Sequence, residues 1–546
     1  MGKPDALRVP LQQERVGAGA GAGTGVNTSI EASIGAQPGR HPGTHLEVCP
    51  KGGSATGSQP ELWITGGATL RGSFEPPGDK SIAHRAAMLA AICEGDSIIC
   101  NYPRSQDCAS TLRCLQALGV GVREKVDSLV VSGRGLCGLQ EPENVLDAGN
   151  SGTTMRLLAG ILAGQNGLFV LTGDASLRRR PMGRITGPLR VMGAMVDGRA
   201  GGALAPLVIR GFGGTGLLAR RHVLPVASAQ VKSCILLAGL YTDGTTTVVE
   251  PAPSRDHTER LLEFAGVRVK KRLPGAGAAS FPGMCSPDPP RACLPWAADV
   301  AGGGVAPEIS VDGGQAPRPF RLVIPGDLSS AAFLLAAAAA LPGSKATAVR
   351  VSANPTRLEF VRVLAGMGAQ VSIEHVECNG PEPVADIHVE HSNLVGVHIP
   401  PEAVPSMIDE VPIFAVMACT ASTPSSIHGI GELRVKETDR VAATIEELSR
   451  MGARVEQDGD SLRIQPSPLR GTRVSARGDH RMAMALAVAG LVASGTTVVE
   501  EWDCVSVSYP DFLGDLNSLI AGEPRGRTTR CWLSGAAHRQ PPSNAY

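Results

Sequence analysis

One local pattern recurs along the chain and constrains its fold more than any other feature. An amphipathic helix is followed by a glycine and then by a short strand of alternating polarity. Five close matches are LQALGVGVRE, LRVMGAMVDG, LEFAGVRVKK, LAGMGAQVSI and LSRMGARVEQ, and LNSLIAG is a weaker sixth. Each glycine fits the left-handed C′ position of a helix; these are Gly119, Gly193, Gly266, Gly368, Gly452 and Gly522. The pattern predicts α/β units that repeat about every seventy residues.

Units of this length are too long for a solenoid, and six of them predict two domains of three units each. The third interval is longer, but it returns to the common spacing when a Pro-, Gly- and Ala-rich insertion at 273–318 is set aside. Helix–glycine–strand segments are also common in α/β proteins in general, so the alternative that they are not a repeat stays open. Residues 1–60 and 523–546 carry little hydrophobic pattern, and we predict a disordered extension and a disordered tail there.

Charge and cysteine content exclude several classes of function. The 546 residues include 51 Lys and Arg and 51 Asp and Glu, so nothing attracts nucleic acid or an anionic membrane in bulk. The longest apolar runs, 331–341 and 483–493, are too short to span a bilayer. Thirteen cysteines occur without a CxxC pair, and no cleavable leader pattern opens the chain. We therefore expect reduced thiols, a cytoplasmic location and no metal site.

Cations occupy positions where a helix is predicted to begin. RVKETDR (434–440) precedes an apolar, periodic stretch and predicts the first turn of a helix containing Lys436 and Arg440. Lys80 in PGDKSIAHRAA and Arg481 in GDHRMAMA are placed alike. A cation at a helix N-terminus costs roughly 0.3–1 kcal/mol, whereas a bound phosphate or carboxylate is favoured there. The pattern predicts a ligand with several negative groups, although any single start could be an ordinary cap.

Three further segments predict binding or proton transfer. GNSGTTMRLLAG (149–160) and ASAQVKSCILLAG (227–239) begin with small polar residues, as anion-binding helix starts do. GDASLRRRPMGR (173–184) carries four arginines, which alone would indicate a solvated basic loop. In PSMIDEVPI, Asp409 and Glu410 interrupt an apolar stretch, where a poorly hydrated carboxylate can act as a base. A helix cap is the alternative for this pair.

As an ordered set, these segments resemble the enolpyruvyl transferase family, in the branch that acts on shikimate 3-phosphate. The matching segments are PGDKSIAHRAA, LDAGNSGTTMRLLAG, GDASLRRRPMGR, ASAQVKSCILLAGL, PGDLSSAAFLLAAA, PSMIDEVPI, ELRVKETDR and GDHRMAMA. The resemblance implies a two-domain, inverse α/β barrel-like fold in which each domain has three βαβαββ units and the active site lies in the interdomain cleft. It places one domain at 78–324 and the other at 61–77 together with 325–522.

The resemblance also implies the reaction. The enolpyruvyl group of phosphoenolpyruvate is transferred to the 5-hydroxyl of shikimate 3-phosphate and phosphate is released. Such enzymes work by addition and elimination through a tetrahedral intermediate, with no metal or organic cofactor. The two substrates supply the phosphates and carboxylates that the cations at the helix starts would bind. We expect these small molecules as the only partners, with no nucleic acid, no membrane and a monomeric protein.

The family's site residues carry over to positions of this chain. Asp409 resembles the base at the 5-hydroxyl, Glu437 the proton-transfer carboxylate, and Lys80 a general acid that touches both substrates. The resemblance implies that the shikimate 3-phosphate ligands are Ser81, Arg85, Ser228, Ala229, Gln230, Arg255 and Lys436. It implies that phosphoenolpyruvate is held by Gly152, Arg180, Arg440 and Arg481. Ala229 replaces a serine found in some relatives, and Val507 replaces a lysine.

Two alternatives remain open at this point. UDP-N-acetylglucosamine enolpyruvyl transferases share the fold, but many carry a reactive cysteine where this chain has Ala175. A non-catalytic protein that binds sugar phosphates could use the same helix starts. That second alternative predicts the loss of Lys80, Asp409 or Glu437, and all three are present.

Overall fold

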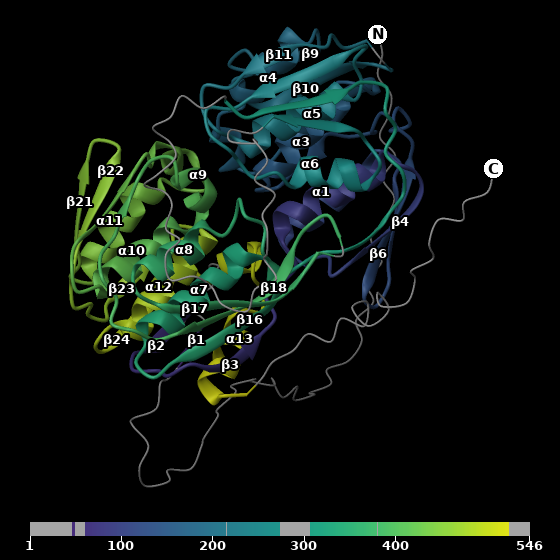
Figure 1. Cartoon of the computed structure of the whole chain (residues 1–546). Helices are drawn as coiled ribbons and strands as arrows, with labels where there is room; N and C mark the ends of the chain where they lie inside the picture. Colours follow the sequence, from purple (N-terminus) through teal and green to yellow (C-terminus); the bar gives the residue numbers. More distant parts are fainter. Residues whose placement is uncertain (1–45, 50–59, 215, 273–305, 379, 524–546) are drawn as a thin grey trace, which may run out of the picture. The chain divides into compact units, whose positions relative to one another are not determined.

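The computed structural model describes residues 46–49, 60–214, 216–272, 306–378 and 380–523, which all fall within one unit, Thr44–Tyr546 (Figure 1). Buried apolar side chains of this unit form two clusters. We call the cluster within 82–324 lobe A, and the cluster formed by 62–74 with 328–519 lobe B. The clusters support the two predicted domains, whose boundaries stay a prediction. None of the helices in the described ranges is long and apolar enough to cross a membrane.

Six four-stranded sheets in the described residues share one strand order: a parallel pair at one edge, followed by two antiparallel neighbours. The sheets of lobe A are β15 (Arg321–Val323), β4 (Glu94–Cys100), β6 (Ser128–Arg134), β5 (Gly121–Glu124); β7 (Leu146–Asp147), β8 (Asn166–Thr172), β10 (Leu204–Phe212), β9 (Met195–Arg199); and β11 (Arg221–Val223), β12 (Thr245–Val249), β14 (Glu308–Asp312), β13 (Val269–Arg272). The sheets of lobe B are β3 (Arg71–Phe74), β16 (Lys345–Ser352), β18 (Val384–Glu390), β17 (Gln370–Glu377); β19 (His398–Ile399), β20 (Ser425–His428), β22 (Ser461–Gln465), β21 (Arg454–Asp458); and β23 (Arg473–Ser475), β24 (Thr496–Glu500), β2 (Glu61–Thr65), β1 (Leu46–Cys49). This repetition confirms the six predicted α/β units.

The chain crosses between the lobes twice, after β3 and after β15. The two crossing segments run side by side: Asp79 N donates to Pro325 O at 2.8 Å, and Asp327 N donates to Pro77 O at 2.8 Å. The first crossing segment also packs tightly on the connection after β4, because a Cβ at Gly78 would lie 2.1 Å from the carbonyl oxygen of Asn101. Only glycine allows so close an approach of two backbones at this point.

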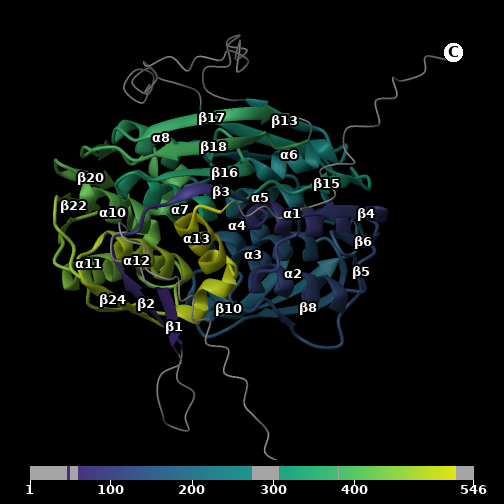
Figure 2. The ribbon, with the colours of Figure 1, turned by 90° about the horizontal axis from the view of Figure 1, so that it is seen from below.

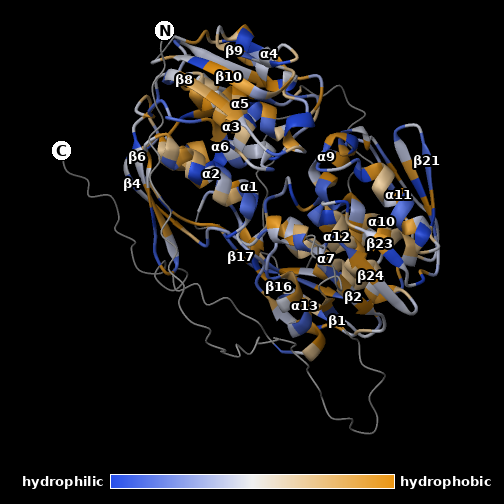
Figure 3. Ribbon diagram, turned by 180° about the vertical axis from the view of Figure 1, so that it is seen from behind, coloured by the Kyte–Doolittle hydropathy of each residue, from blue (hydrophilic) through white to orange (hydrophobic). Residues whose placement is uncertain are grey.

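Each lobe buries the first helix of each of its three units. These helices are α1 (Lys80–Ala91), α3 (Gly152–Leu162) and α5 (Ala229–Gly239) in lobe A, and α7 (Leu328–Ala340), α10 (Val411–Thr420) and α12 (His480–Val492) in lobe B. A helix that is apolar on every side is expected in a core. Figure 3 shows hydrophobic residues, in orange, along α3, α5, α10 and α12. Five of the six are capped by a side chain that accepts a backbone N–H bond; the caps are Asp79, Ser151, Ser228, Asp327 and Asp479.

The second helix of each unit ends in the predicted glycine. These helices are α2 (Gln106–Ala117), α4 (Gly183–Val191), α6 (His257–Phe264), α8 (Glu359–Gly366), α11 (Arg440–Arg450) and α13 (Phe512–Ala521). The six glycines have φ between 73° and 93°, which confirms the left-handed C′ position. Short helical segments are α9 (Val404–Met407), η1 (Leu177–Arg179), η2 (Ile408–Glu410), η3 (Gly431–Val435) and η4 (Trp502–Val507). In Figure 2, α13 lies beside β3, with which it is in contact.

Two predicted appendages contain ordered strands. β1 lies inside the predicted disordered extension 1–60 and pairs antiparallel with β2. β14 lies inside the 273–318 insertion, yet it occupies an inner position between β12 and β13. The predictions were wrong at these positions, because a four- or five-residue strand is stabilised by distant partners that local composition does not reveal. The rest of the extension, the tail beyond residue 523 and residues 273–305 lie outside the described residues.

Candidate active site

One cavity of about 220 Å³ gathers residues at or just before the start of all six buried helices. These residues are Lys80 of α1, Gly152 of α3, Ala229 of α5, Asp327 before α7, Asp409 before α10 and His480 of α12. The first backbone N–H groups of a helix lack partners within the helix, and its dipole is positive at that end. Six such ends at one cavity make an anion-binding site.

The side chains around the cavity add to this positive field. Nine of the lining residues are cations: Lys80, Arg156, Arg180, Arg184, Arg255, Arg357, Lys436, Arg440 and Arg481. Five are carboxylates: Asp107, Asp327, Asp409, Glu432 and Glu437. The excess of four positive charges fits a ligand with several negative groups, as the sequence predicted.

Every predicted site residue except Arg85 lines this cavity. Those from lobe A are Lys80, Ser81, Gly152, Arg180, Ser228, Ala229, Gln230 and Arg255, and those from lobe B are Asp409, Lys436, Glu437, Arg440 and Arg481. Arg85 is only 6% exposed and lies behind the start of α1. Its guanidinium donates to Ser81 O at 3.0 Å, to Thr258 Oγ1 at 2.7 Å and to Ser233 Oγ at 3.0 Å. Its role as a carboxylate ligand stays a prediction.

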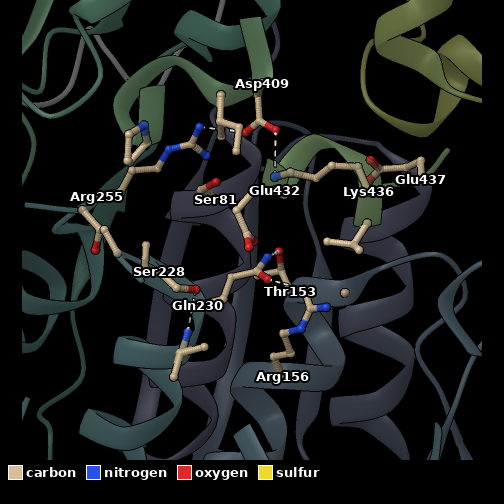
Figure 4. A pocket seen from close by; sticks show the side chains of 18 of the residues that line it. Ser81, Thr153, Arg156, Ser228, Gln230, Arg255, Asp409, Glu432, Lys436 and Glu437 are labelled. Carbon is tan, nitrogen blue, oxygen red and sulfur yellow. Dashed lines mark hydrogen bonds and ion pairs between the residues drawn. The ribbon is translucent and has the colours of Figure 1, made fainter. Parts of the chain in front are cut away.

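Asp409 is the most heavily paired carboxylate of the site. Its Oδ2 lies 2.7 Å from Arg255 Nη2, and its Oδ1 lies 3.4 Å from Lys436 Nζ (Figure 4). Burial alone would raise the pKa of this carboxyl, but four cations outweigh burial and hold the pKa well below its usual range. They are Lys436, Arg481, Arg255 and Arg440. The helix cap considered as an alternative for Asp409 is not seen, because η2 and α10 have no side-chain cap bond within the described chain.

Glu437 lies between two guanidinium groups. Its Oε2 is 2.6 Å from Arg440 Nη2, and its Oε1 is 3.5 Å from Arg180 Nη1. Burial alone would raise the pKa of this carboxyl. The positive charges of Arg440 and then Arg180 are the largest effects in the other direction, and the pKa lies well below its usual range. Arg440 is held in turn by Asp479, with Nε to Oδ2 at 2.8 Å. Both acids that the resemblance assigned to proton transfer are therefore ionised in the unliganded site.

Lys80 begins α1 and pairs with a carboxylate that sequence reasoning did not select. Its Nζ lies 2.9 Å from Asp107 Oδ2 in the first turn of α2. Burial alone would lower the pKa of Lys80. The negative charge of Asp107 is the largest of the effects that raise it, and the net result is a raised pKa. Neighbouring His480 is 2% exposed, and burial together with the charges of Lys80 and Arg481 depresses its pKa well below the usual range. Cationic Lys80 thus faces a neutral imidazole.

Small polar residues of α3 and α5 form the lobe A wall. Gln230 Nε2 donates to Thr153 Oγ1 at 2.9 Å, and Arg156 Nη1 donates to Gln230 Oε1 at 2.5 Å (Figure 4). Arg156 is one turn from Gly152, on the same face of α3. Helical spacing from Gly152 could therefore have identified it as a site residue. Its pKa falls to about 10, because burial and then the charge of Arg180 disfavour the cation.

Only the last residue of the RVKETDR segment, Arg440, belongs to the first turn of a helix. η3 ends at Val435 and α11 begins at Arg440, so Lys436 and Glu437 lie in the connection between them. Asp439 sets this boundary, because its side chain accepts from the backbone N–H groups of Val441 and Ala442 at 3.1 and 3.0 Å. The charged residues still line the cavity, as predicted. Val507, at the end of η4, does not line it.

Other lining residues were not selected from the sequence. Arg184 forms an ion pair with Glu432 across the two lobes, and Ser176 Oγ donates to Glu437 O at 3.0 Å, also across them. The remaining charged or ionisable residues missed are Asp107, Asp327, Arg357 and His480. His480 and Arg184 stood beside selected residues in the motifs, so adjacency was the available signal. Glu432 opens the ELRVKETDR motif, but nothing local indicated its pairing with Arg184, because the two residues are 248 positions apart.

Comparison with known proteins gives a consistent result for sequence and structure. The family model described as EPSP synthase (3-phosphoshikimate 1-carboxyvinyltransferase) matches residues 64–284 and 296–516. The 3-phosphoshikimate 1-carboxyvinyltransferase of Pelotomaculum thermopropionicum is 48% identical, with 81% of this chain and 95% of that protein covered. The protein of the same name from Thermus thermophilus is 47% identical over 83% of this chain and 97% of that one. The solved structure of EPSP synthase from Acinetobacter baumannii matches with a TM-score of 0.70 and 36% identity, covering 85% of this chain and 98% of that one.

Proposed function

The chain belongs to the EPSP synthase family, and on this premise we propose how its cavity carries out the reaction. The protein transfers the enolpyruvyl group of phosphoenolpyruvate to the 5-hydroxyl of shikimate 3-phosphate and releases phosphate. The fold is the two-domain α/β fold that the resemblance implied. The observation that carries the proposal is the convergence of six helix starts and nine cations on one cavity that also holds Asp409 and Glu437.

Phosphoenolpyruvate binds, in our proposal, between Gly152, Arg180, Arg440 and Arg481. The geometry around Gly152 supports this assignment. A Cβ at Gly152 would lie 3.4 Å from Arg180 Nη1, so the helix start and this guanidinium border the same space. Arg180 and Arg440 also flank Glu437, which places a carboxylate beside the anion site. Guanidinium groups match the planar oxygen pairs of carboxylate and phosphate.

Shikimate 3-phosphate binds at the starts of α1 and α5, where Ser81, Ser228, Ala229 and Gln230 line the cavity. Arg255 and Lys436 complete this set from the two lobes. Asp409 pairs with both cations, so it adjoins the position proposed for the sugar ring. The substrate's phosphate and carboxylate would draw these cations away from Asp409.

The proposed proton transfers follow from that competition. Asp409 is a weak base while four cations surround it. Each substrate anion that pairs with a cation lowers the positive potential at Asp409 and raises its basicity toward that needed to accept the 5-hydroxyl proton. The same reasoning applies to Glu437 once phosphoenolpyruvate engages Arg180 and Arg440. Glu437, with its pKa raised, takes up a proton from solvent and delivers it to the methylene carbon in the addition. In the elimination Glu437 takes a proton back from the resulting methyl group while Lys80 donates a proton to the phosphate that leaves.

Phosphate release from phosphoenolpyruvate, measured with and without shikimate 3-phosphate, tests this assignment. We expect release only when both substrates are present. Asp409→Asn and Glu437→Gln keep the size of each side chain but remove the proton acceptor, and each should reduce kcat by about 10²–10⁴-fold. Normal turnover in either variant would remove that residue from the proton transfers.

The protein works, we propose, as a monomer in the cytoplasm and without nucleic acid. All the proposed substrate ligands and proton-transfer residues except Arg85 line one cavity, which supports a site that needs no residue from a partner. Ten cysteines in the described ranges are free thiols, in keeping with a reducing compartment. The net charge of zero supports the absence of nucleic acid.

A further inference from the structure

Arg357, in the turn after β16, has no role in the mechanism above, although it lines the cavity. It is 4% exposed, and its Nη2 lies 3.3 Å from Asp327 Oδ1 and 3.9 Å from Asp79 Oδ2. Asp79 caps α1 and Asp327 caps α7, on the two segments where the chain crosses between the lobes. One guanidinium therefore holds the start of a buried helix from each lobe.

The same guanidinium reaches the segment that carries Asp409. Arg357 Nη2 donates to Ser329 Oγ at 2.8 Å, and the Ser329 hydroxyl donates in turn to the carboxylate of Glu410. Ser329 and Glu410 are 1% and 4% exposed, so water does not compete for these bonds. Buried hydrogen bonds of this kind fix the relative positions of the groups that they join. This chain ends one residue from Asp409.

Asn354, in the same turn, makes comparable contacts beside Arg255. Its Nδ2 donates to Asp256 Oδ1 at 2.7 Å and to Glu382 Oε2 at 2.8 Å. The turn 354–357 therefore touches Asp79 and Asp256, which neighbour Lys80 and Arg255 in the sequence, and it reaches Glu410, beside Asp409, through Ser329. Of the groups in this turn, Arg357 alone contacts both crossing segments, which makes it the decisive one.

We propose that Arg357 is a positioning residue for the transfer, holding Lys80 and Asp409 at a fixed separation across the two lobes through Asp79, Asp327 and the Ser329–Glu410 contact. This inference rests on the roles proposed above for Lys80 and Asp409. Addition and elimination take place on one bound substrate pair, so the proposed base Asp409 and the proposed acid Lys80 must keep one geometry through both steps. A displacement of about 1 Å in such an arrangement reduces the rate by roughly 10²-fold.

The shared guanidinium also has an electrostatic effect that can be measured. Burial and then the charge of Asp79 raise the pKa of Asp327 to about 6, against the opposing charge of Arg357. The other charged or titratable groups that face this pair and its guanidinium are Lys80, Arg255, His257, Asp409, Glu410 and Arg481. Removing Arg357 takes away a charge that lowers the pKa of Asp327, so the carboxylate pair binds a proton at higher pH than in the wild type. The acid limb of the pH–rate profile then moves to higher pH.

The test compares Arg357→Gln with Arg362→Gln in the full chain. Arg362 is the matched control, because it is 44% exposed on the following helix, where it pairs with Glu359. For Arg357→Gln we expect kcat to fall roughly 10–100-fold, while the Kd of shikimate 3-phosphate measured by calorimetry changes by less than about threefold. The acid limb of the pH–rate profile should move to higher pH by about one unit. Arg362→Gln should match the wild type in all three.

Two further variants keep the proposal falsifiable. Arg357→Gln/Asp327→Asn removes the surplus carboxylate but keeps a capping side chain on α7, and it should return the acid limb to its original pH and recover part of kcat. Arg357→Lys retains the charge if Arg357→Gln does not fold. A lysine cannot reproduce the fork of donors, so kcat should fall at least about threefold while the acid limb stays in place.

An acid limb that does not move in Arg357→Gln, or a normal kcat in Arg357→Gln or Arg357→Lys, would overturn the inference. Loss of shikimate 3-phosphate affinity in proportion to kcat would also overturn it, since Arg357 would then be a direct ligand. Asp409→Asn in the same assay separates the two proposals. If Asp409→Asn is inactive and Arg357→Gln is normal, the positioning role alone fails. If Asp409→Asn is active, the role proposed for the base fails.

Discussion

Asp409 Oδ2 and Arg255 Nη2 lie 2.7 Å apart, and this ion pair joins lobe B to lobe A. Both side chains are shielded from solvent, at 14% and 15% exposure. A carboxylate in this pairing cannot readily accept a proton, so the ligand has to displace Arg255 before Asp409 becomes basic. In the unliganded site Arg255 thus keeps the proposed base, Asp409, inactive. The anionic groups of the substrate would bind Arg255 and release Asp409.

Asp409→Asn is expected to separate chemistry from binding. The variant should lower kcat by about 10²–10⁴-fold, because the amide cannot take up the 5-hydroxyl proton. The Kd of shikimate 3-phosphate should stay within about threefold or decrease, since Arg255 is released for the substrate. Steady-state phosphate release and calorimetry measure the two quantities. Glu402→Gln, at an exposed position before α9, is the control and should leave both unchanged. A large loss of affinity would show that Asp409 mainly holds the substrate.

Gly152→Ala is expected to weaken phosphoenolpyruvate selectively. The new methyl group would lie 3.2 Å from Arg156 Nη1 and 3.4 Å from Arg180 Nη1, so it would displace the Arg156 guanidinium by a few tenths of an ångström and fill the space beside Arg180. We expect KM for phosphoenolpyruvate to rise by about 3–30-fold, equivalent to about 0.7–2 kcal/mol. Gly187→Ala is the control, because a Cβ there, inside α4, meets no atom within 4 Å. Equal effects on both substrates would contradict the assignment of Gly152.

Acid is expected to destabilise the protein through two buried histidines. Burial, followed by the charge of Lys80, holds the pKa values of His84 and His480 well below their usual range. The unfolded chain takes up these protons near pH 6.5, whereas the folded chain does not. Their contribution to the free energy of unfolding is therefore complete above pH 6.5 and declines as pH falls toward the depressed pKa values, by up to about 2.7 kcal/mol per pH unit.

Urea unfolding of His84→Gln at several pH values below 6.5 measures that slope. The variant should have a slope smaller by about 1.4 kcal/mol per pH unit. His375→Gln is the control, because His375 is 75% exposed and its removal should not change the slope. An unaltered slope in His84→Gln would mean that the imidazole is protonated in the folded protein.

Ile309→Ala tests whether β14 is part of the core. Ile309 is 3% exposed in lobe A, on the strand between β12 and β13. The substitution should lower the free energy of unfolding by about 2–4 kcal/mol. Val223→Ala in the same sheet is the control, at 67% exposure, and should cost less than about 1 kcal/mol. Similar losses from the two variants would show that β14 does not contribute to the core. Urea titration measures both.

The sequence by itself determined the starts of α1, α3, α5, α7 and α12, the six glycines and the charge of the ligand. Helix caps and C′ glycines depend on residues within a few positions of one another, so local spacing is sufficient to find them. The cations at Lys80 and Arg481 were informative because the helix dipole disfavours them without an anion. The ordered motifs also identified the family, whose fold and reaction the comparisons then showed.

Only the tertiary structure decided which side chains meet. Arg255 and Asp409 are 154 residues apart, and no local rule pairs them. The same limit applies to Arg85, whose guanidinium bonds Thr258 and Ser233, and to β14, whose neighbours are supplied by other parts of the chain. Arg357 acquires its partners only because the two crossing segments are hydrogen-bonded side by side. Long-range contacts of this kind form when the cores bring distant segments together, so short-range patterns contain no record of them.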